Sequence, residues 1–204
     1  MRRSLFGRLT VVAIAGLLLV AGCEVFEQSG TLRVVSINNG NTLRSDIADF
    51  FVYFDKVDSE WVTVYQFMPD SVEVVMQYVE IGPGLPTWTP YVANILKAVI
   101  SYRGTSEDAP VYAPATIPLT QTVMSDPAAK LTTTFYMEVL TASFKYTFWE
   151  EWMQEPPDYD IFDLIDATAT FSGYDTVANR EVKAAGKFQI QVGNLYDDLS
   201  RFGQ

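Results

Sequence analysis

The chain has 204 residues, of which 49% are hydrophobic and 19% charged, and its formal net charge is −11 at pH 7. This composition is typical of a folded globular protein, and the negative charge argues against nucleic acid as a partner because phosphate binding needs a basic surface. With no histidine and a single cysteine, the chain cannot form a histidine-dependent catalytic triad, a histidine-ligated metal site or an intramolecular disulfide.

The first 22 residues have the features of an export signal. Three arginines precede an apolar run from Leu9 to Ala21, which is short for a bilayer-spanning helix of about 20 residues. A basic head, a short apolar segment and small residues before a cleavage point describe a signal peptide. A membrane helix that is retained is the alternative.

The segment Val20-Ala21-Gly22-Cys23 resembles the lipobox of bacterial lipoproteins. The resemblance implies that the Cys23 thiol receives a diacylglyceryl group and that Cys23 becomes the mature N-terminus. Two or more acyl chains anchor a protein firmly, at about 0.8 kcal/mol per buried methylene. Glu24 stands where Asp would favour inner-membrane retention in that family, so the resemblance implies the outer membrane. A secretory signal with a chance cysteine is the alternative.

The expected mature chain is a short tether followed by one folded unit. Removing the three arginines of residues 1–22 from a net charge of −11 leaves −14. Residues 23–30 are expected to be a lipidated tether that keeps the fold within about 30 Å of the membrane. Residues 31–204 are expected to form the domain. The segment 81–90 is rich in proline and glycine and is either a loop or a break between subdomains.

The domain has the pattern of an all-β protein. Short runs rich in Val, Tyr, Phe and Thr alternate with turn residues and predict seven to nine strands. Five of them lie at residues 31–37, 60–67, 71–81, 91–104 and 130–140.

Three segments are less regular than these strands. Residues 45–55 fit a helix or a strand equally, and the first half of 91–104 could be helical. Residues 109–119 contain three prolines and predict an edge strand or an extended connector.

The last part of the domain predicts an antiparallel hairpin. Ala167, Ala169 and Phe171 alternate with polar residues, and residues 180–196 repeat this pattern after a short turn. The segment 171–192 resembles the closing strands of immunoglobulin-like domains of bacterial surface proteins. The resemblance implies an immunoglobulin-like antiparallel β-sandwich, to which we add one or two short helices. Residues 156–166 are the better helix candidate, because acids follow Pro157 in what would be the first turn.

Aromatic residues concentrate between positions 144 and 159. Aromatic side chains with polar groups are common at interfaces, so this segment is a candidate interaction surface. Its members are Tyr146, Trp149, Trp152 and Tyr159, with Trp88 from the proline-rich segment. The alternatives are that these rings cover the edge of the core or stack on sugar rings.

Acidic residues cluster beside these aromatics and raise the possibility of a calcium site. Asp158, Asp160 and Asp163 bring carboxylates together, and Asp175 could join them. The EF-hand pattern fails, however, because positions 5, 6 and 12 counted from Asp158 do not carry the required residues. The alternative is an acid-rich helix start in solvent, and no cofactor is required.

Together these features predict a lipid-anchored envelope protein that acts as a non-catalytic structural or protein-interaction module. Its partners would be the membrane, through the lipid, and another envelope or surface protein. The alternative is a glycan- or calcium-binding surface module. Nucleophile, phosphate-binding and dinucleotide motifs are absent from the sequence, which leaves only a carboxylate-based hydrolase similar to glycoside hydrolases as an enzymatic alternative.

Overall fold

The computed structural model describes residues 29–81, 90–105, 107, 111–126, 130–152 and 162–193. Strands dominate these ranges, and a single α-helix accompanies them. The elements are β1 (Ser29–Ile37), η1 (Asn38–Gly40), β2 (Leu43–Asp46), β3 (Asp49–Asp55), β4 (Glu60–Gln66), β5 (Asp70–Ile81), β6 (Val92–Gly104), β7 (Ala115–Asp126), β8 (Thr133–Leu140), α2 (Ala142–Trp152), β9 (Phe162–Asp175) and β10 (Arg180–Gly193). The predicted all-β class is therefore confirmed.

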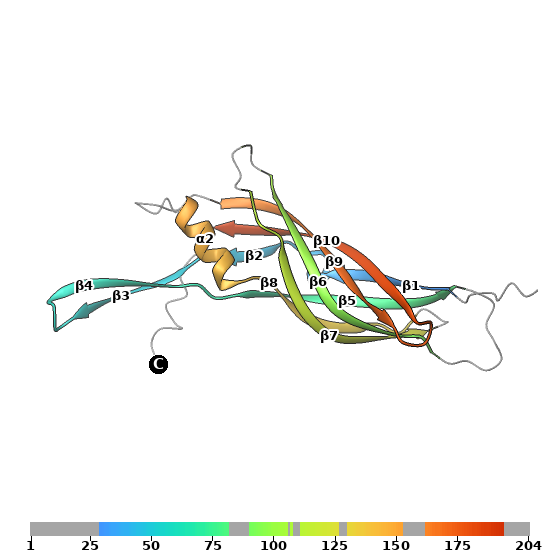
Figure 1. Cartoon of the computed structure of the whole chain (residues 1–204). Helices are drawn as coiled ribbons and strands as arrows, with labels where there is room; N and C mark the ends of the chain where they lie inside the picture. The colour runs from blue at the N-terminus through green and yellow to red at the C-terminus, as the bar shows by residue number, and fades with distance from the viewer. Residues whose placement is uncertain are drawn as a thin grey trace, which may run out of the picture.

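Most strands belong to one curled sheet (Figure 1). Its order is β1-β5-β7-β6-β9-β10-β2, and β8 also pairs with β5. Neighbours are antiparallel except for the pairs β5–β7 and β10–β2. The curl brings β1 over β10, since a Cβ added at Gly186 would lie only 2.8 Å from side-chain atoms of Val34 and Ile37. Strands β3 and β4 form a separate two-stranded sheet.

Strand β7 carries a proline inside the sheet. Pro118 lies opposite Lys97 of β6, whereas β5 pairs only with Ser125 and Asp126 near the other end of β7. In the described part of the chain, Pro118 thus lies where β7 has a neighbour on one side only, which is where a strand tolerates a residue without an amide hydrogen. The predicted edge strand at 109–119 begins at Ala115.

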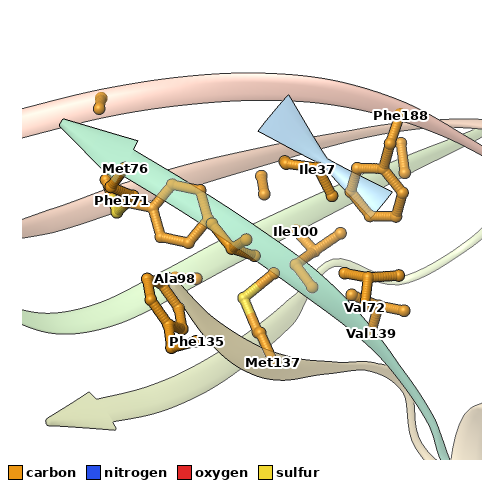
Figure 2. Close-up of a cluster of buried hydrophobic side chains, with 14 of the residues drawn as sticks. Ile37, Val72, Met76, Ala98, Ile100, Phe135, Met137, Val139, Phe171 and Phe188 are labelled. Atoms are coloured by element: carbon orange, nitrogen blue, oxygen red, sulfur yellow. The ribbon is translucent and has the colours of Figure 1, made fainter. Parts of the chain in front are cut away.

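The core fills the inside of the curl. Figure 2 shows side chains from β1, β5, β6, β8, β9 and β10 meeting there, among them Phe135 and Phe171. These two rings meet edge to face with their centroids 6.2 Å apart. Strands on both sides of 82–89 supply this one buried cluster. Full burial of each large apolar side chain contributes about 1.5–3 kcal/mol to folding.

A glycine sets the spacing between the antiparallel partners β6 and β9. A Cβ at Gly173 of β9 would lie 2.0 Å from the backbone oxygen of Asn94 in β6. Beside this contact, the register of β6 shifts between Ile95 and Lys97. The close approach of the two backbones therefore requires a residue without a side chain at position 173.

Several predicted elements can now be compared with the structure. Strands β9 and β10 pair antiparallel over their whole length, which confirms the predicted hairpin. Within 45–55, residues 49–55 are a strand, and β6 is a strand throughout.

The predicted helix at 156–166 is wrong for residues 162–166, which begin β9. Asp163 and Ile165 both point inward, and the two-residue period continues the strand instead of starting a helical turn. Residues 156–161 lie outside the described ranges. The observed helix lies earlier, at 142–152, where the Thr141 hydroxyl accepts a hydrogen bond from the Phe144 amide at 3.0 Å and caps its first turn. Among the described residues, no helix has the length and apolar character needed to cross a membrane.

Candidate functional site

The β3–β4 hairpin projects away from the curled sheet at one end of the molecule (Figure 1). We call residues 49–66 the arm. Its two strands pair with each other from Asp49↔Gln66 to Asp55↔Glu60 and, in the described part of the chain, with no other strand. Both of its outer edges therefore lack a strand neighbour there.

The arm is apolar but exposed. Val57, at the tip, is 89% exposed, and Trp61 is 73% exposed. Apart from Phe50 and Phe51, whose side chains the structure does not describe, no side chain of the arm is buried. Its exposed large hydrophobic residues are Val52, Tyr53, Phe54, Val57, Trp61 and Tyr65. Concentrated apolar surface of this kind is common at the interaction sites of proteins.

Apolar side chains occupy both faces of the arm. Phe54 and Trp61 are paired across the strands and meet edge-on, with ring centroids 5.3 Å apart. The next pair, Tyr53 and Val62, lies on the opposite face because side chains alternate along a strand. Neither face is the polar, solvent-facing side that an ordinary surface hairpin would have.

The root of the arm packs against helix α2 through aromatic contacts. The centroid of the Trp149 ring lies 4.9 Å from that of Tyr65 and 6.0 Å from that of Phe67. The ring centroids of Tyr146 and Phe67 are 5.4 Å apart. Tyr146 is exposed and Trp149 half-buried. Two of the predicted surface aromatics thus lie together, and they extend the apolar surface of the arm onto the helix.

A buried lysine binds both chain segments at the root of the arm. Lys145 of α2 is 2% exposed, and its Nζ lies 2.8 Å from Asp70 Oδ2. The same ammonium donates to the backbone oxygen of Asp46 at 2.6 Å, and the Ser45 hydroxyl donates to Asp70 at 2.5 Å. Asp46 precedes the arm and Asp70 follows it. One side chain therefore holds both segments from which the arm emerges.

The arm is acidic as well as apolar. Asp55, Asp58 and Glu60 surround the tip, and Lys56 is the cation among them. The Asp55 carboxylate accepts the Val57 amide at 2.7 Å, which stabilises the turn. The tip thus presents one large aliphatic side chain among several carboxylates.

The other predicted site residues are distributed as follows. Trp152 ends α2, and the structure does not describe its side chain. The remainder lie outside the described ranges; they are Cys23, Trp88, Asp158, Tyr159 and Asp160.

The acids of the proposed calcium site that the structure describes have protein partners. Asp163 is 2% exposed and accepts the Tyr112 hydroxyl at 2.7 Å. Asp175 is fully buried, and its Oδ1 accepts the Val177 and Ala178 amides at 2.9 Å each. Within the described ranges, no group of three or more cysteine, aspartate or glutamate side chains is arranged to hold a metal ion.

Asp175 also belongs to a buried network that joins β5, β9 and β10. The Tyr78 hydroxyl donates to Asp175 Oδ2, and Arg180 donates to Tyr78 at 3.2 Å and to the backbone oxygen of Gly30 at 2.7 Å. Burial, followed by the bond to Asp175, raises the pKa of Tyr78 to about 12. Because each member binds another inside the fold, we interpret this network as structural.

A separate cavity of about 640 Å³ lies between the loop at 40–42 and strands β6, β9 and β10. Polar and apolar surface contribute about equally to its wall. The polar side chains around it include Ser101, Arg103, Asp166, Thr168, Lys187 and Gln189. Asp166 accepts a hydrogen bond from Gln189 at 3.0 Å. Hydroxyl, amide and guanidinium groups of this kind are suited to binding a small polar molecule.

The arm itself was not anticipated from the sequence as an interaction element. The signal that could have identified it is the pair of aromatic and β-branched runs at 50–54 and 61–65, separated by a short turn rich in charged residues. Those runs predict a hairpin, and their continuous apolar character predicts that both faces are covered.

No protein-family model matches the chain, and no curated protein or solved structure is significantly similar to it.

Proposed function

We propose that the protein is a lipid-anchored component of the bacterial cell envelope. In this proposal it binds a protein partner through the arm and is not a catalyst. The observation that carries the proposal is the exposure of Val57 and Trp61 on a projecting hairpin. Isolated two-stranded hairpins are marginally stable in water. A hairpin with apolar residues on both faces gains stability when a partner covers it.

The anchor in this proposal is the lipid on Cys23, by resemblance to the lipoprotein signal. The described structure starts with β1 at Ser29, a few residues after that cysteine in the sequence. The outer membrane is the proposed location, because Glu24 follows the cysteine.

The domain in this proposal is an immunoglobulin-like sandwich with the arm inserted into it. In support, β1, β5 and β8 form one group of paired strands, and β7, β6, β9, β10 and β2 form another. Two such groups packed face to face correspond to the two layers of that fold. Strands β5 and β7 meet over two residue pairs, where the groups join.

The non-catalytic part of the proposal is argued from the sequence, which lacks nucleophile, phosphate-binding and dinucleotide motifs. A carboxylate-based glycoside hydrolase would use two acids about 5–10 Å apart; of the described residues that line the cavity, Asp166 is the acid. The chain contains no histidine that could act as a base.

Two measurements test the anchor and the interaction separately. Cys23→Ala should abolish acylation and signal cleavage, as read by mass spectrometry of the purified native protein. An unmodified thiol at Cys23 in the wild-type protein contradicts the anchor. Crosslinking in intact cells should recover a complex, and recovery of only the free monomer contradicts the interaction.

The cavity beside the loop at 40–42 supports a second candidate function, the binding of a glycan. Arg103 and Lys187 bring positive charge to an otherwise acidic protein, which favours a sugar that carries a carboxylate or phosphate. Thermal melts with acidic oligosaccharides, and separately with calcium, test both ligand classes. No increase in Tm at millimolar ligand would remove this candidate.

A further inference from the structure

We propose that the arm inserts tip first into an apolar cleft of a partner protein, and that the inner end of this cleft carries lysine or arginine. This inference rests on the proposed interaction function and deepens it by defining the chemistry of the partner. It rests on three properties of the arm: its exposed side chains, the charge of its tip and its position relative to Ser29.

A cleft fits the arm better than a neighbouring strand does. A strand added to an edge of the arm would supply backbone hydrogen bonds but would leave both faces in water. Phe54 and Trp61 are exposed on one face, and Tyr53 on the other. Only a partner that encloses the arm removes both sets of side chains from water.

The tip determines the charge of the partner. Asp55, Asp58 and Glu60 outnumber Lys56 there. Carboxylates that enter a protein interior without counter-charges are strongly unfavourable. A cleft that accepts this tip must therefore offer cationic side chains, and opposite charges would also accelerate and orient the encounter.

The same charges argue against two other occupants. Two copies of the arm that met tip first would bring their acidic tips together, which like-charge repulsion opposes. A lipid bilayer would have to accept the carboxylates beside Val57, and anionic headgroups would repel them.

The position of the arm directs it away from the start of the described chain. Ser29 pairs with Ile81 at one end of β5, whereas Asp70, at the other end, follows the root of the arm. Strand β5 has 12 residues and spans roughly 40 Å, and the seven residues of β3 add roughly 20 Å. In Figure 1 the arm continues outward from that far end. If the lipid anchor precedes Ser29, the tip of the arm lies at the end of the molecule opposite the anchor and would bind a partner there.

The test is site-specific photocrosslinking with the full-length protein in the cells that produce it. A benzoyl-phenylalanine replaces Val57 or Trp61 in the arm, and Val111 or Val177 in two control variants. The control sites are also exposed hydrophobic residues, and Val111 is 99% exposed. We expect a discrete adduct with one protein from both arm positions and none from the controls.

The charge and the apolar contact are then tested separately. The triple variant D55N/D58N/E60Q, crosslinked from position 61, should form at least about fivefold less adduct if the partner supplies cations. With the identified partner purified, Trp61→Ser should weaken binding about 30-fold or more, as a buried aromatic anchor would. Unchanged adduct yield or unchanged affinity overturns the corresponding half of the inference. Urea unfolding of each variant confirms that the fold is retained.

The remaining outcomes separate this inference from the proposed function. An adduct between two copies of the chain, or arm-dependent flotation with phosphatidylethanolamine–phosphatidylglycerol vesicles, overturns the inference in favour of self-association or lipid binding. A discrete protein adduct from Val111 or Val177 alone overturns the inference but leaves an interaction protein. If no position yields any adduct, both proposals fail.

Discussion

Lys145 Nζ lies 2.8 Å from Asp70 Oδ2, and this ion pair ties helix α2 to the strand that follows the arm. The lysine side chain is nearly inaccessible, whereas that of Asp70 is 27% exposed. A buried ammonium needs both its counter-ion and its hydrogen bonds. The Asp46 carbonyl supplies one further acceptor. The direction of the arm and the stability of its root therefore depend on the same few atoms.

Asp70→Asn should therefore destabilise the protein. It removes the negative charge but keeps the shape, and it leaves Lys145 buried without its counter-ion. We expect the free energy of unfolding to fall by about 2–4 kcal/mol, measured by urea denaturation. Lys183→Ala is the matched control, because Lys183 and Glu181 form an ion pair in which both side chains are 62% exposed. The control should cost less than about 1 kcal/mol. Equal losses in the two variants would refute a structural role for the buried pair.

Substitutions on the arm should change the free energy of unfolding less than Asp70→Asn does. Val57→Ser should change the free energy of unfolding by less than about 0.5 kcal/mol, because Val57 is exposed. Trp61→Ser should cost about 1 kcal/mol, the value of its contact with Phe54. Phe171→Ala, in the core, should cost about 3–5 kcal/mol. If Trp61→Ser matched the core variant in urea denaturation, the arm would be part of the stabilising core and not a free surface.

High pH should destabilise the protein through Tyr78. Below pH 10 the phenol is protonated in both the folded and unfolded states, so this group does not alter stability. Between pH 10 and about 12 the unfolded tyrosine loses its proton while the folded one keeps it. The folded state then binds more protons, and the free energy of unfolding falls as pH rises. The buried Tyr102, whose pKa is also raised by burial, acts in the same direction.

Tyr78→Phe checks this assignment. The variant should be less stable at pH 8 by about 1–3 kcal/mol, because Asp175 and Arg180 each lose a hydrogen bond. Its stability should then fall less steeply above pH 10 than that of the wild type. Parallel curves for the two proteins would show that another group governs the alkaline transition.

Gly173 and Gly186 should differ in their tolerance of a methyl group. At Gly173 the added Cβ would meet the Asn94 backbone at 2.0 Å, and the paired strands would have to separate. Gly173→Ala should therefore cost at least about 3 kcal/mol. At Gly186 the nearest atoms are side-chain methyls of Val34 and Ile37 at 2.8 Å. Those methyls can shift, so Gly186→Ala should cost about 1–2 kcal/mol. The reverse order in thermal or urea unfolding would contradict the backbone explanation.

The hairpin of β9 and β10 was predictable because each strand buries one face. Ala167, Ala169 and Phe171 are buried and alternate with less buried polar residues, and a two-residue period of this kind identifies a strand. The arm lacks that contrast. Both of its faces are apolar and none of its described side chains is buried, so its first strand could be mistaken for a helix on spacing alone.

Helix α2 was missed for a related reason. Phe144 and Phe148 lie on its inner side and Tyr146 lies on its outer side, so aromatic residues surround much of the helix. The buried Lys145 further obscures any apolar stripe. Lys145 depends on Asp46 and Asp70, which are distant in sequence, and no local pattern could have indicated that contact.

The parallel pairing of β2 with β10 has a consequence for how the chain reaches its folded state. Residues 43–46 obtain their ladder neighbours only from residues 190–193, close to the opposite end of the described chain. Long-range pairing of this kind slows folding, because a large loop must close before any contact compensates for it. For a polypeptide exported from its N-terminus, as the proposed anchor requires, residues 43–46 would lack these ladder neighbours until the final strand emerged. Until then this edge of β10's sheet would stay incomplete.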